Sequence, residues 1–329
     1  MPLKLALLAP KAIAHNLHHF MNLSELSSQD IATLADSLAQ HPDYRVLRRL
    51  IPRHSFLPTV PGQALQKAVV LDTETTGLSA QDDQVIELGM IAFEFDPVAG
   101  TVHRVLQVFD ELEDPGRPIP PETTQIHHIT DEMVSGKRIN DREVEKILAD
   151  ASVIIAHNAA FDRPFVENRW PVFENKQWVC SIKDIDWKSE GVGSAKLEYL
   201  LQTQGIFYEA HRAETDCWAL LELLNAVLPQ SQQPALLSLL ESLNQSQVRL
   251  YATGAPFDSK DFLKARAYRW APEIKCWHRQ LGGEKALQEE LSWLKNKVYQ
   301  GRRATVEIET LGGLVRHSAR QGQKTTQVL

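Results

Sequence analysis

Hydrophobic and polar positions in the middle of the chain follow two periods, one typical of strands and one typical of helices. Runs of β-branched and aromatic residues predict strands near 68–73, 85–95, 102–108 and 152–156. Apolar residues at helical spacing predict helices near 141–149, 159–168, 195–204 and 213–228. This order of elements predicts an α/β fold in which helices flank a mixed sheet.

Changes in composition divide the chain into five parts. We expect, in chain order, a helical N-terminal extension at 1–66, the α/β domain at 67–228, a linker at 229–244, a small α+β module at 245–321 and a tail at 322–329. In the module the pattern predicts a helix over 259–268 that Asp258 caps, and a hairpin that contains Trp270 and Trp277.

Composition narrows the class of protein. The chain has 329 residues, of which 43% are hydrophobic, and this is enough to bury a sizeable core. Three scattered cysteines without a CxxC pair argue against a disulfide framework and for a reducing compartment. Because no apolar run is long enough to span a membrane, we expect a cytoplasmic protein without membrane contact.

The first expected strand ends in two carboxylates, Asp72 and Glu74. Residues two apart point to the same side of a strand, so the two carboxylates face one another and lose hydration. This arrangement is costly unless a cation lies between them, and carboxylates select Mg²⁺ or Mn²⁺. The pattern indicates a metal-dependent phosphoryl-transfer enzyme. Taken alone, the pair also fits an ordinary acidic turn.

Two later segments supply further acidic residues. Asn158 follows the strand at 152–156 and is expected to cap the helix that carries Asp162. Asp216 opens an apolar helix, and His211 lies five residues before it on a loop. Alone, Asp162 also fits a surface helix and His211 an ordinary loop histidine.

Together these motifs resemble those of the DnaQ-like DEDDh 3′→5′ exonucleases, the superfamily of the proofreading ε subunit of bacterial DNA polymerase III. The matching motifs are Asp72-x-Glu74, His157-Asn158-x-x-Phe161-Asp162 and His211-x-x-x-x-Asp216. The segment 120–133 resembles the family's connection between the first two motifs, with His128 where glycine is usual. The resemblance covers residues 67–228 and implies an RNase H-like fold.

The resemblance also implies a mechanism, namely hydrolysis assisted by two Mg²⁺ or Mn²⁺ ions. Asp72, Glu74 and Asp216 would hold one ion, and Asp72 would bridge to a second ion near Asp162. His211 would be the general base, since imidazole titrates near neutral pH. The expected product is a nucleoside 5′-monophosphate.

A group of residues beside the acidic motifs is expected to bind the terminal nucleotide. In the family this role falls to residues after the first strand, and two aromatic residues are stacking candidates; the set here is Thr73, Thr75, Thr76, Gly77, Leu78, Asn158, Phe161 and Phe165. The alternative is that the threonines only form a turn and the two phenylalanines only pack in the core.

The net charge of −7 is unevenly distributed. Residues 245–321 contain 14 Lys and Arg against 8 Asp and Glu, a basic balance that suits contact with nucleic acid. Trp270, Trp277 and Arg279 are the candidates for stacking on bases. A core role for these tryptophans is the equal alternative.

We expect DNA 3′ ends as the substrate. RNA 3′-end trimming is the first alternative, because the metals act on phosphate in both polymers. A non-catalytic, nucleic-acid-binding subunit of a replication or repair complex is the second. A protein partner from replication or repair fits either.

Overall fold

The computed structural model describes residues 27–245 and 247–329 and comprises two compact units, the first ending at Arg48 and the second running from Arg49 to Leu329. In the first unit, helix α1 (Ser28–Ala39) begins at a capping box: the Ser27 hydroxyl accepts from the Asp30 amide while the Asp30 carboxylate accepts from the Ser27 amide. Of the expected helical extension, residues 1–26 lie outside the described part. Residues 40–65 contain only the short strand β1 (Arg48–Arg49) rather than further helix.

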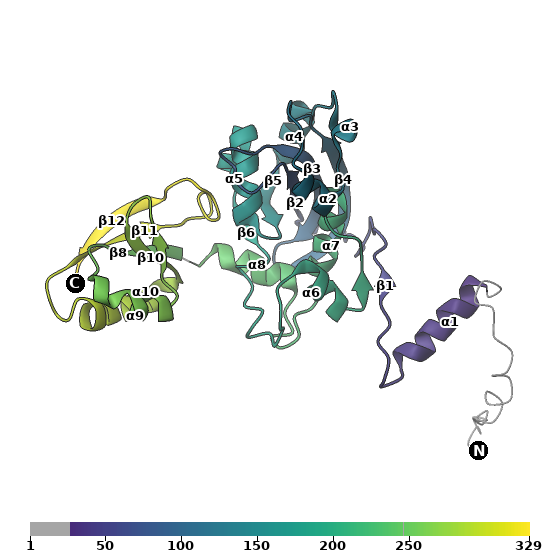
Figure 1. The fold of residues 1–329 in the computed structure, drawn as a ribbon. Coiled ribbons are helices and arrows are strands. Elements are labelled where there is room, and N and C mark those ends of the chain that lie inside the picture. The colour runs from purple at the N-terminus through teal and green to yellow at the C-terminus, as the bar shows by residue number, and fades with distance from the viewer. Residues whose placement is uncertain (1–26, 246) are drawn as a thin grey trace, which may run out of the picture. The chain divides into compact units, whose positions relative to one another are not determined.

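The second unit is built on a five-stranded mixed sheet (Figure 1). Its strand order is β4-β3-β2-β5-β6; β2, β3 and β4 are antiparallel, whereas β5 and β6 run parallel to β2. The bounds are β2 (Gln66–Thr75), β3 (Val85–Asp96), β4 (Thr101–Leu112), β5 (Ala151–Ala156) and β6 (Trp178–Cys180). This is an RNase H-like arrangement, so the fold expected from the pattern is confirmed.

Helices cover both faces of this sheet because its central strands are apolar on both sides. One face packs against α4 (Asp141–Leu148), α5 (Ala159–Arg169) and the 3₁₀ helix η3 (Pro171–Asn175). The other packs against α6 (Leu197–Thr203), α7 (Ala213–Leu224) and α8 (Ala235–Leu243). Three short elements complete the domain: α2 (Pro121–His127), α3 (Asp131–Val134) and β7 (Ile206–Phe207).

Helix α8 corrects the linker expected at 229–244. Its residues Leu236 and Leu239 are fully buried in the core beside α7. The Pro- and Gln-rich stretch before the helix is only a turn, in which the Gln232 amide donates to the Leu228 carbonyl. The α/β domain therefore continues to Leu243.

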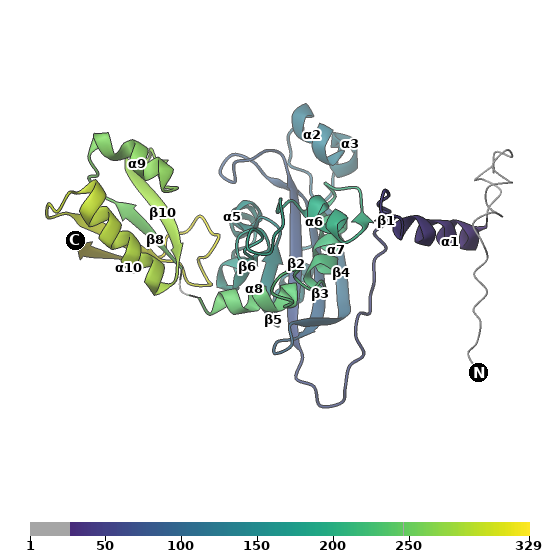
Figure 2. The ribbon, with the colours of Figure 1, turned by 90° about the horizontal axis from the view of Figure 1, so that it is seen from below.

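The C-terminal module is an antiparallel sheet with helices (Figure 2). Its strand order is β12-β11-β8-β10-β9, with bounds β8 (Gln247–Ala252), β9 (Arg269–Ala271), β10 (Cys276–Gly282), β11 (Thr305–Thr310) and β12 (Gln323–Val328). The helical elements are η4 (Phe257–Ser259), α9 (Lys260–Ala265), α10 (Gly283–Trp293) and the π-helix η5 (Leu294–Val298).

Two expectations for the module are wrong. The segment 322–329, expected to be a tail, contains β12, which pairs with β11 along its whole length. The helix expected over 259–268 ends at Ala265, and its N-cap is Ser259 rather than Asp258. The chain leaves the helix early because Ala267 adopts a left-handed conformation (φ 63°).

A loop between β11 and β12, residues 311–322, joins the module to the α/β domain. The guanidinium of Arg163 on α5 is fully buried and donates to the main-chain carbonyls of Gly313, Leu314 and Arg316. Glu167, one turn further along α5, accepts from the Ser318 hydroxyl and the Arg320 guanidinium. Buried charges bonded in this way hold the loop firmly against α5.

Two general expectations bear on the chain as a whole. The three cysteines, Cys180, Cys217 and Cys276, are free and buried. No helix in the described part of the chain has both the length and the apolar character needed to cross a membrane.

Candidate active site

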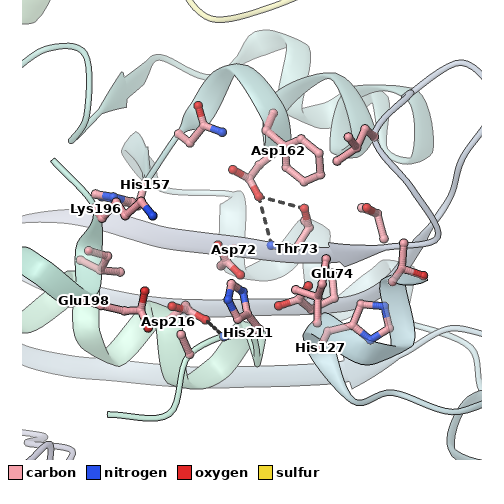
Figure 3. Close-up of a pocket in the computed structure, with 18 of the residues that line it drawn as sticks. Asp72, Thr73, Glu74, His127, His157, Asp162, Lys196, Glu198, His211 and Asp216 are labelled. Atoms are coloured by element: carbon pink, nitrogen blue, oxygen red, sulfur yellow. Dashed lines mark hydrogen bonds between the residues drawn. The ribbon is translucent and has the colours of Figure 1, made fainter. Parts of the chain in front are cut away.

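The central strand β2 and helix α7 bring three carboxylates together. Asp72 and Glu74 leave β2 on the same side, and Asp216 lies in the first turn of α7. Oxygen atoms of these three side chains lie within 4.8 Å of one another (Figure 3). The prediction that Asp72 and Glu74 face one side together is confirmed.

Gly89 on β3 explains how α7 comes so close to the sheet. It pairs with Asp72 in the β2–β3 register. A Cβ atom at this position would lie 2.5 Å from the main-chain carbon of Ala213 at the start of α7. Glycine is therefore needed here for the approach of a helix backbone, and that approach delivers Asp216 to the cluster.

Asp162 completes the acidic set from α5. Its Oδ1 accepts from both the amide and the hydroxyl of Thr73, at 3.1 and 2.8 Å, so β2 fixes its orientation. Its Oδ2 is buried and has no hydrogen-bond partner among the described residues. A buried oxygen left in this state favours a cation as its partner.

The pKa values of these carboxyl groups reflect their crowding. Burial, and then the charge of Asp216, raises the pKa of Glu74 to about 8. Burial also raises the pKa of Asp162 to about 7, and raises those of Asp72 and Asp216. A bound divalent cation would lower these pKa values again, because it favours the ionised form of every ligand.

The loop before α7 holds His211 over the cluster. Figure 3 shows its imidazole among the carboxylates of Asp72, Glu74 and Asp216. His211 adopts a left-handed conformation (φ 68°), and its amide donates to Asp216 at 2.7 Å. Next to it, Arg212 forms a bidentate ion pair with the fully buried Glu87 on β3, donating to both carboxylate oxygens, and this pair anchors the loop.

The acidic residues line a cavity of about 510 Å³. Most of the residues expected to bind the terminal nucleotide also line it, namely Thr73, Thr75, Gly77, Leu78, Asn158 and Phe161. The side chain of Leu78 is 87% exposed, an unusual position for an apolar residue beside a polar site.

Two of the expected binding residues lie elsewhere. The Thr76 hydroxyl bonds Asp83 and Arg117 rather than lining the cavity. Phe165 is buried in the core against Phe161, as the packing alternative predicts. Asn158 occupies the N-cap position of α5, but in a left-handed conformation (φ 82°) without a side-chain capping bond, so its amide is free to face the cavity.

The cavity also includes residues that the sequence analysis did not select: Thr123, Ile126, His127, His157, Ile182, Lys196, Leu197, Glu198, Tyr208 and Ala210. The Nε2 atoms of His127 and His157 are buried without a partner among the described residues. The Ile129 amide donates to Nδ1 of His127, so in the neutral ring Nε2 carries the proton and is a free donor.

A sequence signal existed for these two histidines. His157 opens the second motif, and His127 lies in the segment that resembles the family's connection. No signal marked Tyr208, whose hydroxyl donates to Asp216 at 2.9 Å, because the contact depends on how the loop folds back. His128, where the family has glycine, is left-handed (φ 60°), the conformation that glycine adopts most easily.

The residues of the C-terminal module that were expected to stack on bases mostly contact other residues of the module. Arg279 forms an ion pair with Glu290 at 2.8 Å. Trp277 packs against the module core, and Trp270 is about half exposed with its ring edge against Trp277. Of these three residues, Trp270 is the most exposed.

Comparison with known proteins identifies the α/β domain. The family model described as exonuclease (RNase_T) matches residues 69–224. The DNA polymerase III subunit epsilon of Treponema pallidum (strain Nichols) is 32% identical over 170 residues, covering 48% of this chain and 74% of that protein. The chain belongs to the DnaQ-like exonuclease family. It is a nuclease of the hydrolase class, as its motifs predict.

Other similar proteins match this chain over very different shares of their own length. The PolC-type DNA polymerase III of Lacticaseibacillus paracasei is 38% identical over 103 residues, which are 30% of this chain and 7% of that protein. The structure described as Exonuclease X in complex with 5′ overhanging duplex DNA is 24% identical with a TM-score of 0.38, and covers 52% of this chain and 99% of that one.

Proposed function

We propose that this exonuclease removes nucleotides from DNA 3′ ends in a metal-dependent reaction that releases nucleoside 5′-monophosphates. The observation that carries the proposal is the cluster of Asp72, Glu74 and Asp216, with ligand atoms within 4.8 Å, beside the buried Asp162. These residues match the acidic positions of the family motifs in order and spacing.

The donor set fits Mg²⁺ or Mn²⁺. All four candidate ligands are carboxylates, which hard cations prefer, and one oxygen of Asp162 is buried with no partner in the described part of the chain. Asp72, Glu74 and Asp216 would hold one ion, and Asp72 with Asp162 would hold a second. When bound, the ions supply charge for the phosphodiester transition state and a more acidic water.

The chain's own residues supply binding and proton transfer. His211, on the loop over the carboxylates, would take a proton from the attacking water. Nε2 of His127, which has no partner among the described residues, and the amide of Asn158 would bind oxygen atoms of the terminal nucleotide. The exposed side chain of Leu78 offers an apolar contact for its base.

DNA is favoured over RNA by the relatives. The matched proteins are named as DNA polymerase III subunits or PolC-type DNA polymerases. A chain with this exonuclease domain is therefore expected to act on DNA, and a replication or repair protein is the partner expected of it. RNA trimming stays as the alternative, since the acidic site acts on phosphate in both polymers.

The test compares three strands of one sequence, each labelled at the 5′ end: single-stranded DNA, duplex DNA and RNA. With Mn²⁺ we expect a ladder of shortened, still labelled DNA products, and nucleoside 5′-monophosphates by chromatography. Release of the 5′ label as a mononucleotide would contradict the 3′→5′ direction. Faster shortening of RNA than of either DNA would transfer the proposal to RNA.

A further inference from the structure

A further cavity, of about 480 Å³, lies in the C-terminal module. It is formed by the connection from β8 to α9 and by the connection from η5 to β11, and it shares no residue with the cavity of the acidic site. Its charged lining residues are Lys297, Arg302, Arg303 and Asp258. Three cations therefore face one carboxylate.

The three cations are not paired within the described part of the chain. Lys297, Arg302 and Arg303 are exposed, and none takes part in an ion pair or side-chain hydrogen bond there. Other arginines of the module behave differently: Arg266 and Arg279 both pair with the buried Glu290. From 294 to 304 the chain contains no acidic residue. The cavity thus offers positive charge to an external anion.

Two phenylalanines give this surface an aromatic component. Phe262 lines the cavity and is 62% exposed, and Phe257, which follows the lining residue Pro256 in the chain, is 80% exposed. The Lys260 ammonium lies 4.8 Å from the centre of the Phe257 ring. Exposure of large apolar rings to water is unfavourable, and clusters of such rings often mark binding sites. Aromatic rings beside cations are the usual platform on which single-stranded bases stack.

The backbone that carries the cations is irregular. Helix α10 ends in the π-helix η5, and the following turn holds Gln300 in a left-handed conformation (φ 52°). π-helices are rare in proteins, but those that occur often lie at functional sites. A non-glycine residue in the left-handed region raises the free energy of the folded state. This conformation brings Lys297 and Arg302 to one cavity.

We propose that this surface, formed by Phe257, Phe262, Lys297, Arg302 and Arg303, binds the single-stranded part of a nucleic acid. The cations bind phosphates, and the two rings stack on bases. That the nucleic acid is the substrate of the exonuclease rests on the proposed function. This surface would have the binding role that was expected of Trp277 and Arg279, which instead pack against the module core and pair with Glu290.

The test uses the full chain with EDTA, so that binding is measured without cleavage. Fluorescence anisotropy with a labelled 15-nucleotide dT strand compares the wild type with the double variant Arg302→Glu/Arg303→Glu. The matched control is Lys275→Glu/Lys285→Glu, an equal change of charge at exposed lysines outside the cavity. Lys275 lies between β9 and β10, so this control also probes the tryptophan hairpin.

We expect at least about ten-fold weaker binding for the arginine variant than for the control. The slope of the logarithm of its binding constant against the logarithm of salt concentration should become shallower by about 1.4, since each lost phosphate contact on a single strand accounts for about 0.7. Phe257→Ala/Phe262→Ala should weaken binding at unchanged slope. Equal binding by the two charge variants would overturn the proposal. So would loss of affinity for a polyglutamate peptide with DNA binding unchanged, which would indicate an acidic protein partner.

A separate measurement distinguishes this inference from the proposed function. Hydrolysis of the p-nitrophenyl ester of thymidine 5′-monophosphate with Mn²⁺ needs only the acidic site. It should be unchanged in Arg302→Glu/Arg303→Glu. If the wild type hydrolyses nothing while the difference in DNA binding persists, the proposed function fails and the binding surface stands.

Discussion

At the scale of single residues, the acidic cluster is costly for the fold. Burial and mutual repulsion raise the pKa values of Glu74 and Asp162 to about 8 and about 7, from ordinary values near 4. Each carboxyl group therefore binds its proton more tightly in the folded protein than in the unfolded chain. The acidic cluster therefore lowers the free energy of unfolding at neutral pH, and a bound cation raises it again.

The first prediction concerns pH. With EDTA present, the folded protein binds more protons than the unfolded chain from about pH 4 to about pH 8, so stability falls as pH rises through this range. Thermal unfolding at pH 5, 6, 7 and 8 should show a falling Tm. Mg²⁺ should raise Tm more at pH 8 than at pH 6. A Tm that rises over this range, with no metal effect, would contradict the electrostatic account.

The second prediction concerns Asp72. Asp72→Asn removes one ligand and one source of repulsion, so turnover should fall by about 100-fold or more while the metal-free protein keeps or gains Tm. Exonuclease assays and thermal unfolding in EDTA check both parts. The Mg²⁺-induced rise in Tm should shrink in the variant. A fall of several degrees in the metal-free Tm would instead give Asp72 a structural role.

At the scale of elements, the site depends on how closely α7 approaches β3. The third prediction is that Gly89→Ala lowers stability by about 1–3 kcal/mol, because the new methyl group displaces the helix backbone. Displacement of α7 also moves Asp216, so kcat should fall as well. Gly282→Ala is the matched control, since its Cβ would meet nothing within 4 Å. Equal effects of the two substitutions would refute the close-packing argument.

How well an element was predicted depends on how far its residues face the core. Strands β2, β3 and β5 are buried on both sides, so their apolar runs were plain in the sequence. Strand β12 is exposed at every position and formed only because β11 offers a free edge, which no local pattern reveals. Helix α8 has an apolar pattern, but the Pro- and Gln-rich turn before it obscured its start.

In the acidic site, too, some features were predictable from the sequence and others were not. Asp72, Glu74, Asp162, His211 and Asp216 lie in compact motifs, and it is the resemblance of these motifs to the exonuclease family that implies a common site. Contacts between distant segments were not predictable, such as Arg212 with Glu87 and Tyr208 with Asp216. They depend on the conformation of a loop with a left-handed residue.

At the scale of the whole molecule, the 311–322 loop ties the C-terminal module to the helix that carries Asp162. Arg163 and Glu167 on α5 are buried with partners in this loop. From these buried contacts we expect the module to contribute to the stability of the catalytic domain.

The fourth prediction follows from this tie. Removing residues 311–329 leaves the buried Arg163 without its carbonyl acceptors, which should cost about 3 kcal/mol or more and reduce cleavage of short and long substrates alike. Removing only 323–329 keeps the loop and should cost much less. Thermal unfolding of the two truncations checks this difference. A 311–329 deletion with unchanged Tm and activity would show instead that the module is independent of the catalytic domain.

The central claim is that these carboxylates form a metal-dependent 3′→5′ nuclease site, and one time course tests it most directly. Single-stranded DNA labelled at its 5′ end is incubated with Mn²⁺ and either wild type or Asp72→Asn. We expect stepwise shortening from the 3′ end by the wild type, abolished by EDTA and in the folded variant. Shortening that persists in EDTA or in the variant would contradict it.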